Sequence, residues 1–373
     1  AGTATWTFGD LTIGGNTTLS FSGNDKRAIK FVATGLGPVG IGNILIEKNL
    51  NLNGANGAGN DTSGGSRKFG SGAGGDDAFG STVRAGESAA SDAYTTVGGI
   101  GGGRYTNNST ENKGGGGGAF GGDGGDSYTG LPTGGSWYGR LDLANLGKGG
   151  SPRGGSGGGA SNRGSGGSGG GAIQLLAVND ITIASGVSIT AKGGGGSSSS
   201  TTTVEKRRSG GGGSGGGIRI VADSDRDGFG TLISVGSTLN VSGGVSDNTT
   251  ITAEFGGDGG GGRIALSGAS VLAGTMKVSG GDHGRSGCKG ENGSVLMDAK
   301  DGVLSLSGNG LAANAYTQYA NLNLSAKSTM ELGGANAIAT VTVSNSVVAT
   351  VAGALVMDLD GADSGSADRL IVT

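Results

Sequence analysis

The hydrophobic residues of this chain occur in short runs in which apolar and polar positions alternate. Alternation with a period of two is typical of β-strands that bury one face. In the first 57 residues it predicts strands at 5–8, 11–13, 18–21, 28–33, 44–47 and 50–53. No stretch places apolar residues at positions i, i+3, i+4 and i+7 over the length of a helix. The pattern therefore predicts an all-β protein.

The alternating runs recur as larger units further along the chain. The units lie at 172–192, 218–244, 263–281 and 294–310, separated by glycine-rich stretches at 193–217, 243–262 and 281–293. Each stretch leaves after one strand and returns just before the next, so the stretches would all lie at one corner of a repeating coil. This repetition predicts a right-handed parallel β-helix, a solenoid with glycine-rich loop insertions on one side.

The glycine content has two interpretations. The chain has 91 glycines and 3 prolines in 373 residues, whereas glycine usually supplies about 7% of a protein. Collagen would need glycine at every third position with abundant proline, and the sequence has neither. The long glycine-rich insertion is either disordered, or its runs adopt an extended, polyglycine-II-like conformation and pack backbone against backbone.

These features divide the chain into four parts. We expect N-terminal β-helix rungs at 1–57, a glycine-rich insertion at 58–170, rungs with glycine-rich loops at 171–315 and C-terminal rungs at 316–373. In the last part the glycine runs stop and the predicted strands become longer.

Charge and hydrophobicity exclude two classes of partner. The formal net charge is -3, with both signs scattered along the chain, so a concentrated basic surface for nucleic acid is not expected. No apolar run approaches the roughly 20 residues that cross a bilayer, so no membrane span is expected. The chain starts at Ala1 without a basic and apolar leader, as expected of a mature or trimmed product. Its single cysteine, Cys288, is compatible with an extracellular location.

Two stretches carry a resemblance to a known family. The Gly-Gly-Gly run before Ile218-Arg-Ile-Val-Ala, and its repeat before Arg263-Ile-Ala-Leu, resemble glycine-rich parallel β-helix surface proteins of bacteria. The stretch 355–373 is similar to the repeats of the autotransporter-passenger-like and exosorted types. The resemblance implies an extracellular or cell-surface protein without a fixed activity. The glycine runs also resemble the tips of phage tail adhesins.

One stretch fits a calcium-binding pattern. Residues 121–129 match the nonapeptide G-G-x-G-x-D-x-U-x, with Asp123 and Asp126 as the carboxylates. Such sites need tandem copies to complete the oxygen shell, and the chain has one copy. Calcium at Asp123 and Asp126 is the one cofactor that the sequence suggests, and a chance match in a glycine-rich chain is the alternative.

Candidate catalytic residues lack a rigid support. His283 and Cys288 could form a base and a nucleophile, but both lie in a glycine-rich loop. A polysaccharide-degrading enzyme would need several carboxylates on one face, and the sequence does not align its acidic residues in register: Glu47, Glu254, Glu291, Asp298 and Glu331. We therefore predict a protein that is not an enzyme.

The two ends of the predicted coil suggest a function. Trp6 and Phe8 lie in the first predicted strand, and Leu370 and Val372 lie in the last. Unpaired strand edges are templates for another chain, and head-to-tail addition builds a fibre. We predict an extracellular structural protein, a filament or surface-fibre subunit that forms a homopolymer. The alternative is a carbohydrate-binding adhesin or phage-type receptor-binding protein, in which Trp137 and Tyr138 contact a cell-surface or matrix polysaccharide.

Overall fold

The structure is a computed structural model. It describes residues 3–15, 27–35, 41–58, 64–66, 69, 71–75, 86, 114–128, 133–138, 143, 153–161, 164–198, 209–222, 224, 230–233, 237–247, 255–268 and 270–299, and the backbone of 304–306, 311–313, 317–324, 329–332, 340–349, 354–357 and 369–372. The predicted strand at 18–21 lies outside these residues.

The described regular elements are β-strands that pair in parallel, and they form four sheets. The six-stranded sheet contains β1 (Thr3–Phe8), β3 (Ala28–Ala33), β6 (Ala172–Ala177), β9 (Gly217–Val221), β12 (Arg263–Gly268) and β15 (Ser294–Ala299). The nine-stranded sheet contains β2 (Leu11–Ile13), β4 (Ile44–Ile46), β7 (Ile181–Ile183), β10 (Thr231–Ile233), β13 (Ser270–Ala273), β16 (Leu304–Leu306), β18 (Thr317–Leu324), β20 (Thr340–Ala349) and β22 (Arg369–Val372). The four-stranded sheet contains β5 (Leu50–Asn51), β8 (Ser188–Thr190), β11 (Thr238–Asn240) and β14 (Thr275–Lys277). The three-stranded sheet contains β17 (Leu311–Ala313), β19 (Thr329–Leu332) and β21 (Ala354–Met357).

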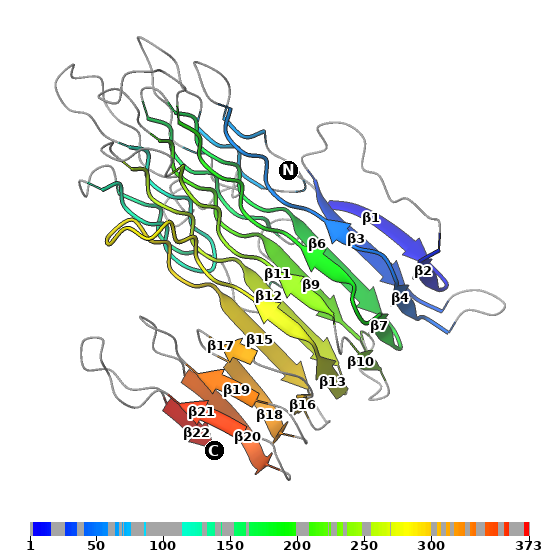
Figure 1. Cartoon of the computed structure of the whole chain (residues 1–373). Coiled ribbons are helices and arrows are strands. Elements are labelled where there is room, and N and C mark those ends of the chain that lie inside the picture. Colours follow the sequence, from blue (N-terminus) through cyan, green and yellow to red (C-terminus); the bar gives the residue numbers. More distant parts are fainter. Residues whose placement is uncertain are drawn as a thin grey trace.

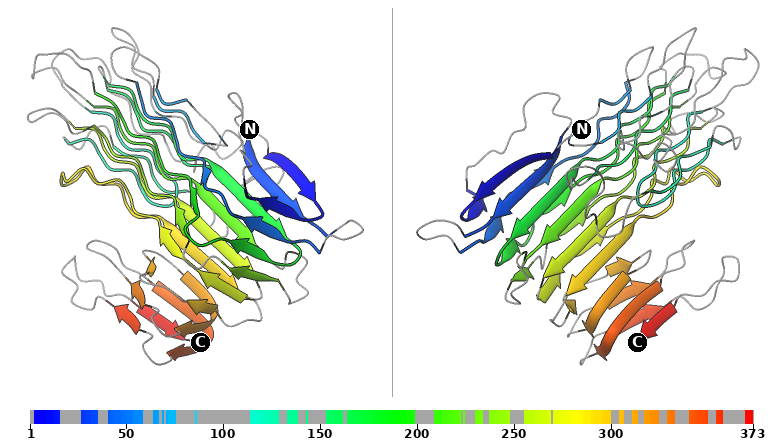
Figure 2. Two further views of the ribbon diagram at one scale, coloured as in Figure 1. Left: turned by 45° about the vertical axis from the view of Figure 1, so that its right-hand side comes forward. Right: turned by 180° about the vertical axis from the view of Figure 1, so that it is seen from behind.

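Consecutive strands belong to different sheets, so the chain builds layers. The strands β6, β7 and β8 form one layer, β9, β10 and β11 the next, and β12, β13 and β14 the one after. Figure 1 shows these layers stacked in chain order from blue to red, with the first layer at one end of the stack and β22 at the other. Both views in Figure 2 show extended, strand-free segments projecting from one side of the layers.

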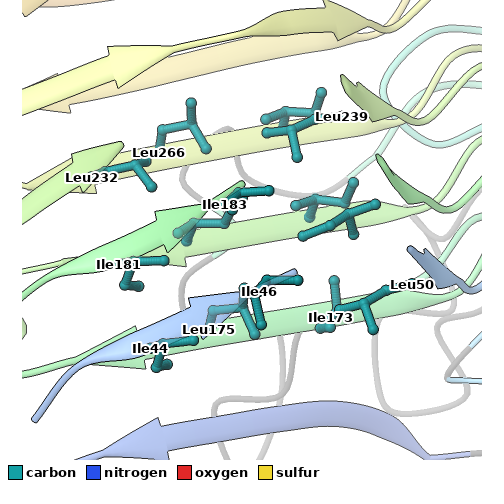
Figure 3. Packing of buried hydrophobic residues seen from close by; sticks show 14 of the residues in the cluster. Ile44, Ile46, Leu50, Ile173, Leu175, Ile181, Ile183, Leu232, Leu239 and Leu266 are labelled. Atoms are coloured by element: carbon teal, nitrogen blue, oxygen red, sulfur yellow. The ribbon is translucent and has the colours of Figure 1, made fainter. Parts of the chain in front are cut away.

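The hydrophobic core lies between the sheets. Along β3 the burial alternates between buried and half-buried positions, and β4 and β7 repeat this pattern, because neighbouring side chains of a strand point to opposite faces. Figure 3 shows the inward aliphatic side chains of successive layers in contact, with Ile46, Ile183 and Leu175 near the middle. Burial of each such side chain contributes about 1.5–3 kcal/mol, so the core grows with every added layer.

Parallel register places core residues directly above one another. One column runs through Trp6, Phe31, Leu175, Ile220 and Leu266. Trp6 belongs to the first layer, where its ring covers that of Phe31 with the centroids 5.4 Å apart. The aromatic pair therefore covers one end of the aliphatic core.

The projecting segments pack against one another through their backbones. Segment 164–171 donates hydrogen bonds in three directions that repeat every third residue: Gly166 and Gly169 donate to 71–75, Gly167 and Gly170 to 209–216, and Ser168 and Gly171 to 52–58. An extended chain with three residues per turn produces this repeat. Of the two alternatives for the glycine runs, the described segments show the second, in which extended segments pack side by side. We call these packed segments, which include 52–58, 71–75, 164–171 and 209–216, the glycine layer.

Close approach explains why these segments need glycine. A Cβ atom on Gly213 would lie 2.1 Å from the carbonyl oxygen of Ser168, and one on Gly257 would lie 1.7 Å from that of Gly125. Side chains at such positions would force neighbouring segments apart.

The predicted boundaries after residues 57 and 170 divide the chain between segments that are hydrogen-bonded to each other in the structure, such as 52–58 and 164–171.

The prediction of a right-handed parallel β-helix is wrong for this chain. The described strands form separate parallel sheets, and the described residues show no closed solenoid. After β8 the chain does not turn directly into β9: it runs outward along 191–198 and returns along 209–216, where Gly213 donates to the carbonyl oxygen of Gly194. Because glycine has no side chain, the two segments can bond along their length, and the layer stays open on this side.

Candidate functional site

The first layer ends in β1, whose outer edge has no partner strand among the described strands. β1 is the end strand of the six-stranded sheet and pairs with β3. Thr5, Trp6 and Thr7 are exposed, and Trp6 is 39% exposed although its position belongs to the core column. Phe8 also lies against Phe31, with ring centroids 6.2 Å apart. The predicted assembly residues Trp6 and Phe8 therefore lie together at the open end of the core.

A ladder of polar side chains links the layers beside this edge. The Oδ1 atom of Asp10 accepts hydrogen bonds of 2.8 Å from the backbone N–H groups of Gly42 and Asn43. Asn43 Oδ1 accepts from Asp180 N at 3.0 Å, and Asp180 Oδ1 accepts from Thr231 N at 2.8 Å. Each acceptor precedes a short strand and bonds to the next layer. Sequence reasoning missed this ladder, although an Asp or Asn directly before a short apolar run marks each position.

The predicted C-terminal assembly residues lie on an end strand of the nine-stranded sheet. In β22, Leu370 is in register with Val341, and Val372 with Val343. The strand thus has one edge paired with β20, and its other edge is unpaired among the described strands. The open edges at the two ends of the stack belong to different sheets.

The two carboxylates of the predicted calcium site hold backbone groups. Asp126 Oδ1 accepts a hydrogen bond from Gly134 N at 2.8 Å, and Asp123 Oδ1 accepts one from Trp137 N. In the part of the chain that the structure describes, no group of three or more His, Cys, Asp or Glu side chains could hold a metal ion. In this geometry Asp123 and Asp126 anchor the segment 133–138.

The structure separates the two predicted glycan contacts. Trp137 is 59% exposed, whereas Tyr138 is 3% exposed. The Tyr138 ring packs on Phe120 with centroids 5.1 Å apart, and its hydroxyl donates to the carbonyl oxygen of Gly154 at 3.2 Å. Trp137 is accessible to a sugar, and Tyr138 serves packing.

A buried arginine beneath these aromatics was not recognised in the sequence. Arg263, the first residue of β12, donates to Tyr138 O at 3.0 Å, Phe120 O at 3.4 Å and Ser294 Oγ at 3.0 Å. Its guanidinium lies 5.6 Å from the centre of the Phe120 ring. Burial lowers the pKa of Arg263 to about 10. The side chain joins the glycine-rich insertion to the strand layers, and an arginine after a glycine run is the sequence signal for it.

The lone histidine and cysteine do not form a nucleophile and base. His283 Nδ1 lies 2.7 Å from Asp258 Oδ2 and 3.1 Å from Ser246 Oγ. Both partners meet the same ring nitrogen, so the imidazole does not relay a proton from the hydroxyl to the carboxylate. Burial raises the pKa of the Cys288 thiol to about 11, which keeps it protonated at neutral pH. In this arrangement Cys288 is not an activated nucleophile.

No family model, no curated protein and no solved structure matches the chain. Among the described residues, no helix has the length and apolar character needed to cross a membrane.

Proposed function

We propose that this chain is an extracellular structural protein whose copies add end to end into a filament or surface fibre. The observation that carries the proposal is the open edge of β1, where Trp6 is exposed at a core position directly over Phe31. A strand at the edge of a sheet is a template for a further strand. A partner strand there would extend both the sheet and the aromatic end of the core.

The chemistry of the first layer fits a partner that continues the stack. The Asp10–Asn43–Asp180 ladder repeats from layer to layer, so an added layer could extend the polar contacts as well as the apolar ones. Because the two end surfaces differ, their contact is heterologous and does not close on itself. Such a contact produces a linear polymer.

Assembly is tested with the whole chain at rising concentration. We expect sedimentation velocity and negative-stain imaging to show linear particles that lengthen with concentration. Trp6→Lys places a charge on the open edge and should leave a folded monomer. Tyr128→Lys changes another exposed residue, outside β1, and should assemble normally. A wild-type monomer that stays monodisperse at high concentration would contradict the proposal.

A second candidate function rests on Trp137. An exposed tryptophan beside a buried cation offers a stacking face for a sugar ring, and Arg263 lies 5.9 Å from the centre of that ring. A carbohydrate-binding adhesin predicts selective binding on a glycan array that Trp137→Ala abolishes. A change at the exposed Tyr128 serves as the control. Equal binding by wild type and Trp137→Ala would remove this alternative.

A further inference from the structure

The outer face of the glycine layer contains a polar groove. Its volume is about 500 Å³, and Asn56, Lys192, Val245 and Asp282 line it together with the glycine backbones of segments 191–198 and 241–247. These two segments follow β8 and β11, so they occupy equivalent places in successive layers. The groove therefore crosses from one layer to the next.

Backbone carbonyl groups of segment 191–198 point in three directions. The carbonyls of Ala191, Gly194 and Ser197 accept from the returning segment 209–216, and those of Lys192 and Gly195 accept from Gly54 and Gly57. Gly193 and Gly196 line the groove, and their carbonyls accept no hydrogen bond from any described residue. These free carbonyls are three residues apart, which is the repeat of the layer itself.

The equivalent segment of the next layer has the same arrangement. The carbonyls of Val241 and Gly244 accept from Gly262 and Gly259, and those of Ser242 and Val245 accept from Gly193 and Gly196. The carbonyls of Gly243 and Ser246 have no donor among the described residues, and both residues line the groove. Two successive layers thus contribute four free acceptors in matching positions.

Three N–H groups next to these carbonyls in the chain donate to asparagine side chains. Asn53 Oδ1 accepts from Lys192 N at 2.8 Å, and Asn56 Oδ1 accepts from Gly195 N at 2.9 Å. In the next layer Asn240 Oδ1 accepts from Ser242 N at 3.0 Å. Val245 N is a free donor in the groove among the described contacts. The backbone of the groove consequently offers four free acceptors and one free donor among the described contacts, and it suits a ligand with regularly spaced donors.

We propose that the groove binds a further glycine-rich peptide segment in the extended threefold conformation. Its amide N–H groups would donate to the carbonyls of Gly193, Gly196, Gly243 and Ser246, as the internal segments donate to one another. A threefold chain presents an N–H to the same side at every third residue, which matches the spacing of the acceptors. The ligand would occupy one more position of the glycine layer, and this proposal is independent of end-to-end assembly.

A synthetic peptide provides the probe. The sequence of residues 209–217, Ser-Gly-Gly-Gly-Gly-Ser-Gly-Gly-Gly, carries a fluorophore and is titrated with dilute wild-type protein while anisotropy is measured. We expect saturable binding. The matched control peptide has every glycine replaced by N-methylglycine, which removes the glycine N–H donors, and it should bind at least about tenfold more weakly, a difference of about 1.4 kcal/mol.

Protein variants locate the binding. Val245→Trp fills the groove and should weaken binding at least about tenfold, whereas Val245→Thr keeps the side-chain volume and should leave binding unchanged. Lys192→Trp is the second groove-filling variant if Val245→Trp does not fold, as judged by its thermal unfolding. The proposal is overturned if wild type shows no saturable binding, if the N-methylated peptide binds equally, or if both groove-filling variants bind normally. Displacement of the peptide by an oligosaccharide mixture would assign the groove to sugars instead.

Discussion

The Nη2 atom of Arg263 donates a 3.0 Å hydrogen bond to the carbonyl oxygen of Tyr138, 125 residues earlier in the chain. This contact joins the beginning of β12 to the glycine-rich insertion. The same guanidinium also reaches Phe120 O and Ser294 Oγ. One side chain therefore connects parts of the molecule that are distant in sequence.

Removal of this side chain should destabilise the protein. Arg263→Ala leaves a cavity and three acceptors without their donor, and we expect the free energy of unfolding to fall by about 3 kcal/mol. Urea unfolding followed by circular dichroism measures the change. Arg285 is an exposed arginine 4.8 Å from the centre of the Phe255 ring, and Arg285→Ala should cost about 0.5–1 kcal/mol. Equal losses for the two variants would refute a special role for Arg263.

Glycine-to-alanine changes should separate close positions from open ones. In Gly213→Ala the new methyl group would lie 2.1 Å from Ser168 O, so the segments must move apart. We expect a loss of about 3 kcal/mol. In Gly195→Ala the nearest atom outside the adjoining residues would be Val245 O at 3.1 Å, and the loss should be clearly smaller. Chemical denaturation of both variants tests this order, and a larger loss for Gly195→Ala would contradict it.

The polar ladder should protect specific backbone amides. Asp10→Ala removes the acceptor of Gly42 N and Asn43 N, and we expect a loss of about 1 kcal/mol. Hydrogen exchange at these two amides should become faster, while exchange in β12 stays unchanged. Asp10→Asn retains a carbonyl acceptor and should restore most of the protection. Unchanged exchange in Asp10→Ala would show that the ladder is energetically neutral.

Stability should fall at high pH because of Cys288. The pKa of its thiol is raised from 9.0 to about 11 in the folded state, with burial as the main cause. Below pH 9 the thiol is protonated in both the folded and the unfolded state, so its ionisation does not lower the free energy of unfolding. Between about pH 9 and pH 11 the unfolded chain loses the proton first, so the free energy of unfolding decreases.

The comparison with Cys288→Ala isolates this effect. Other groups titrate in the same range, so the difference between wild type and variant is the relevant quantity, measured by urea unfolding at pH 7, 8.5 and 10. As the pH rises, we expect the free energy of unfolding of wild type to fall relative to that of Cys288→Ala. A difference that stays constant would show that the thiol does not contribute.

The alternation of residues predicted many strands, because burial of one face requires a period of two. The prediction at 28–33 coincides with β3, and the one at 11–13 with β2. The prediction of a closed coil was wrong because a glycine run can form either a tight corner or a segment that runs outward from the layers and returns. The neighbours of each glycine segment depend on backbone contacts, and glycines carry no side chain that distinguishes one neighbour from another.

The candidate site was only partly predictable for a related reason. Trp6 and Phe8 could be placed at the end of the stack because they lie in an early apolar strand. Tyr138 could not be distinguished from its exposed neighbour Trp137, because the burial of Tyr138 depends on Phe120 and Gly154. Arg263 was missed because the sequence does not show which backbone carbonyls it would meet, and its position directly after a glycine run is the one signal that marks it.

The bonding in three directions within segment 164–171 has a mechanical consequence. In a β-sheet the hydrogen bonds of a strand lie in one plane, so a pulling force at a strand end can break them one after another. Here neighbouring residues bond to different segments on different sides. If the hydrogen bonds between two segments break, each of these segments is still hydrogen-bonded to other segments. The projecting side of the molecule should therefore resist shear in several directions at once.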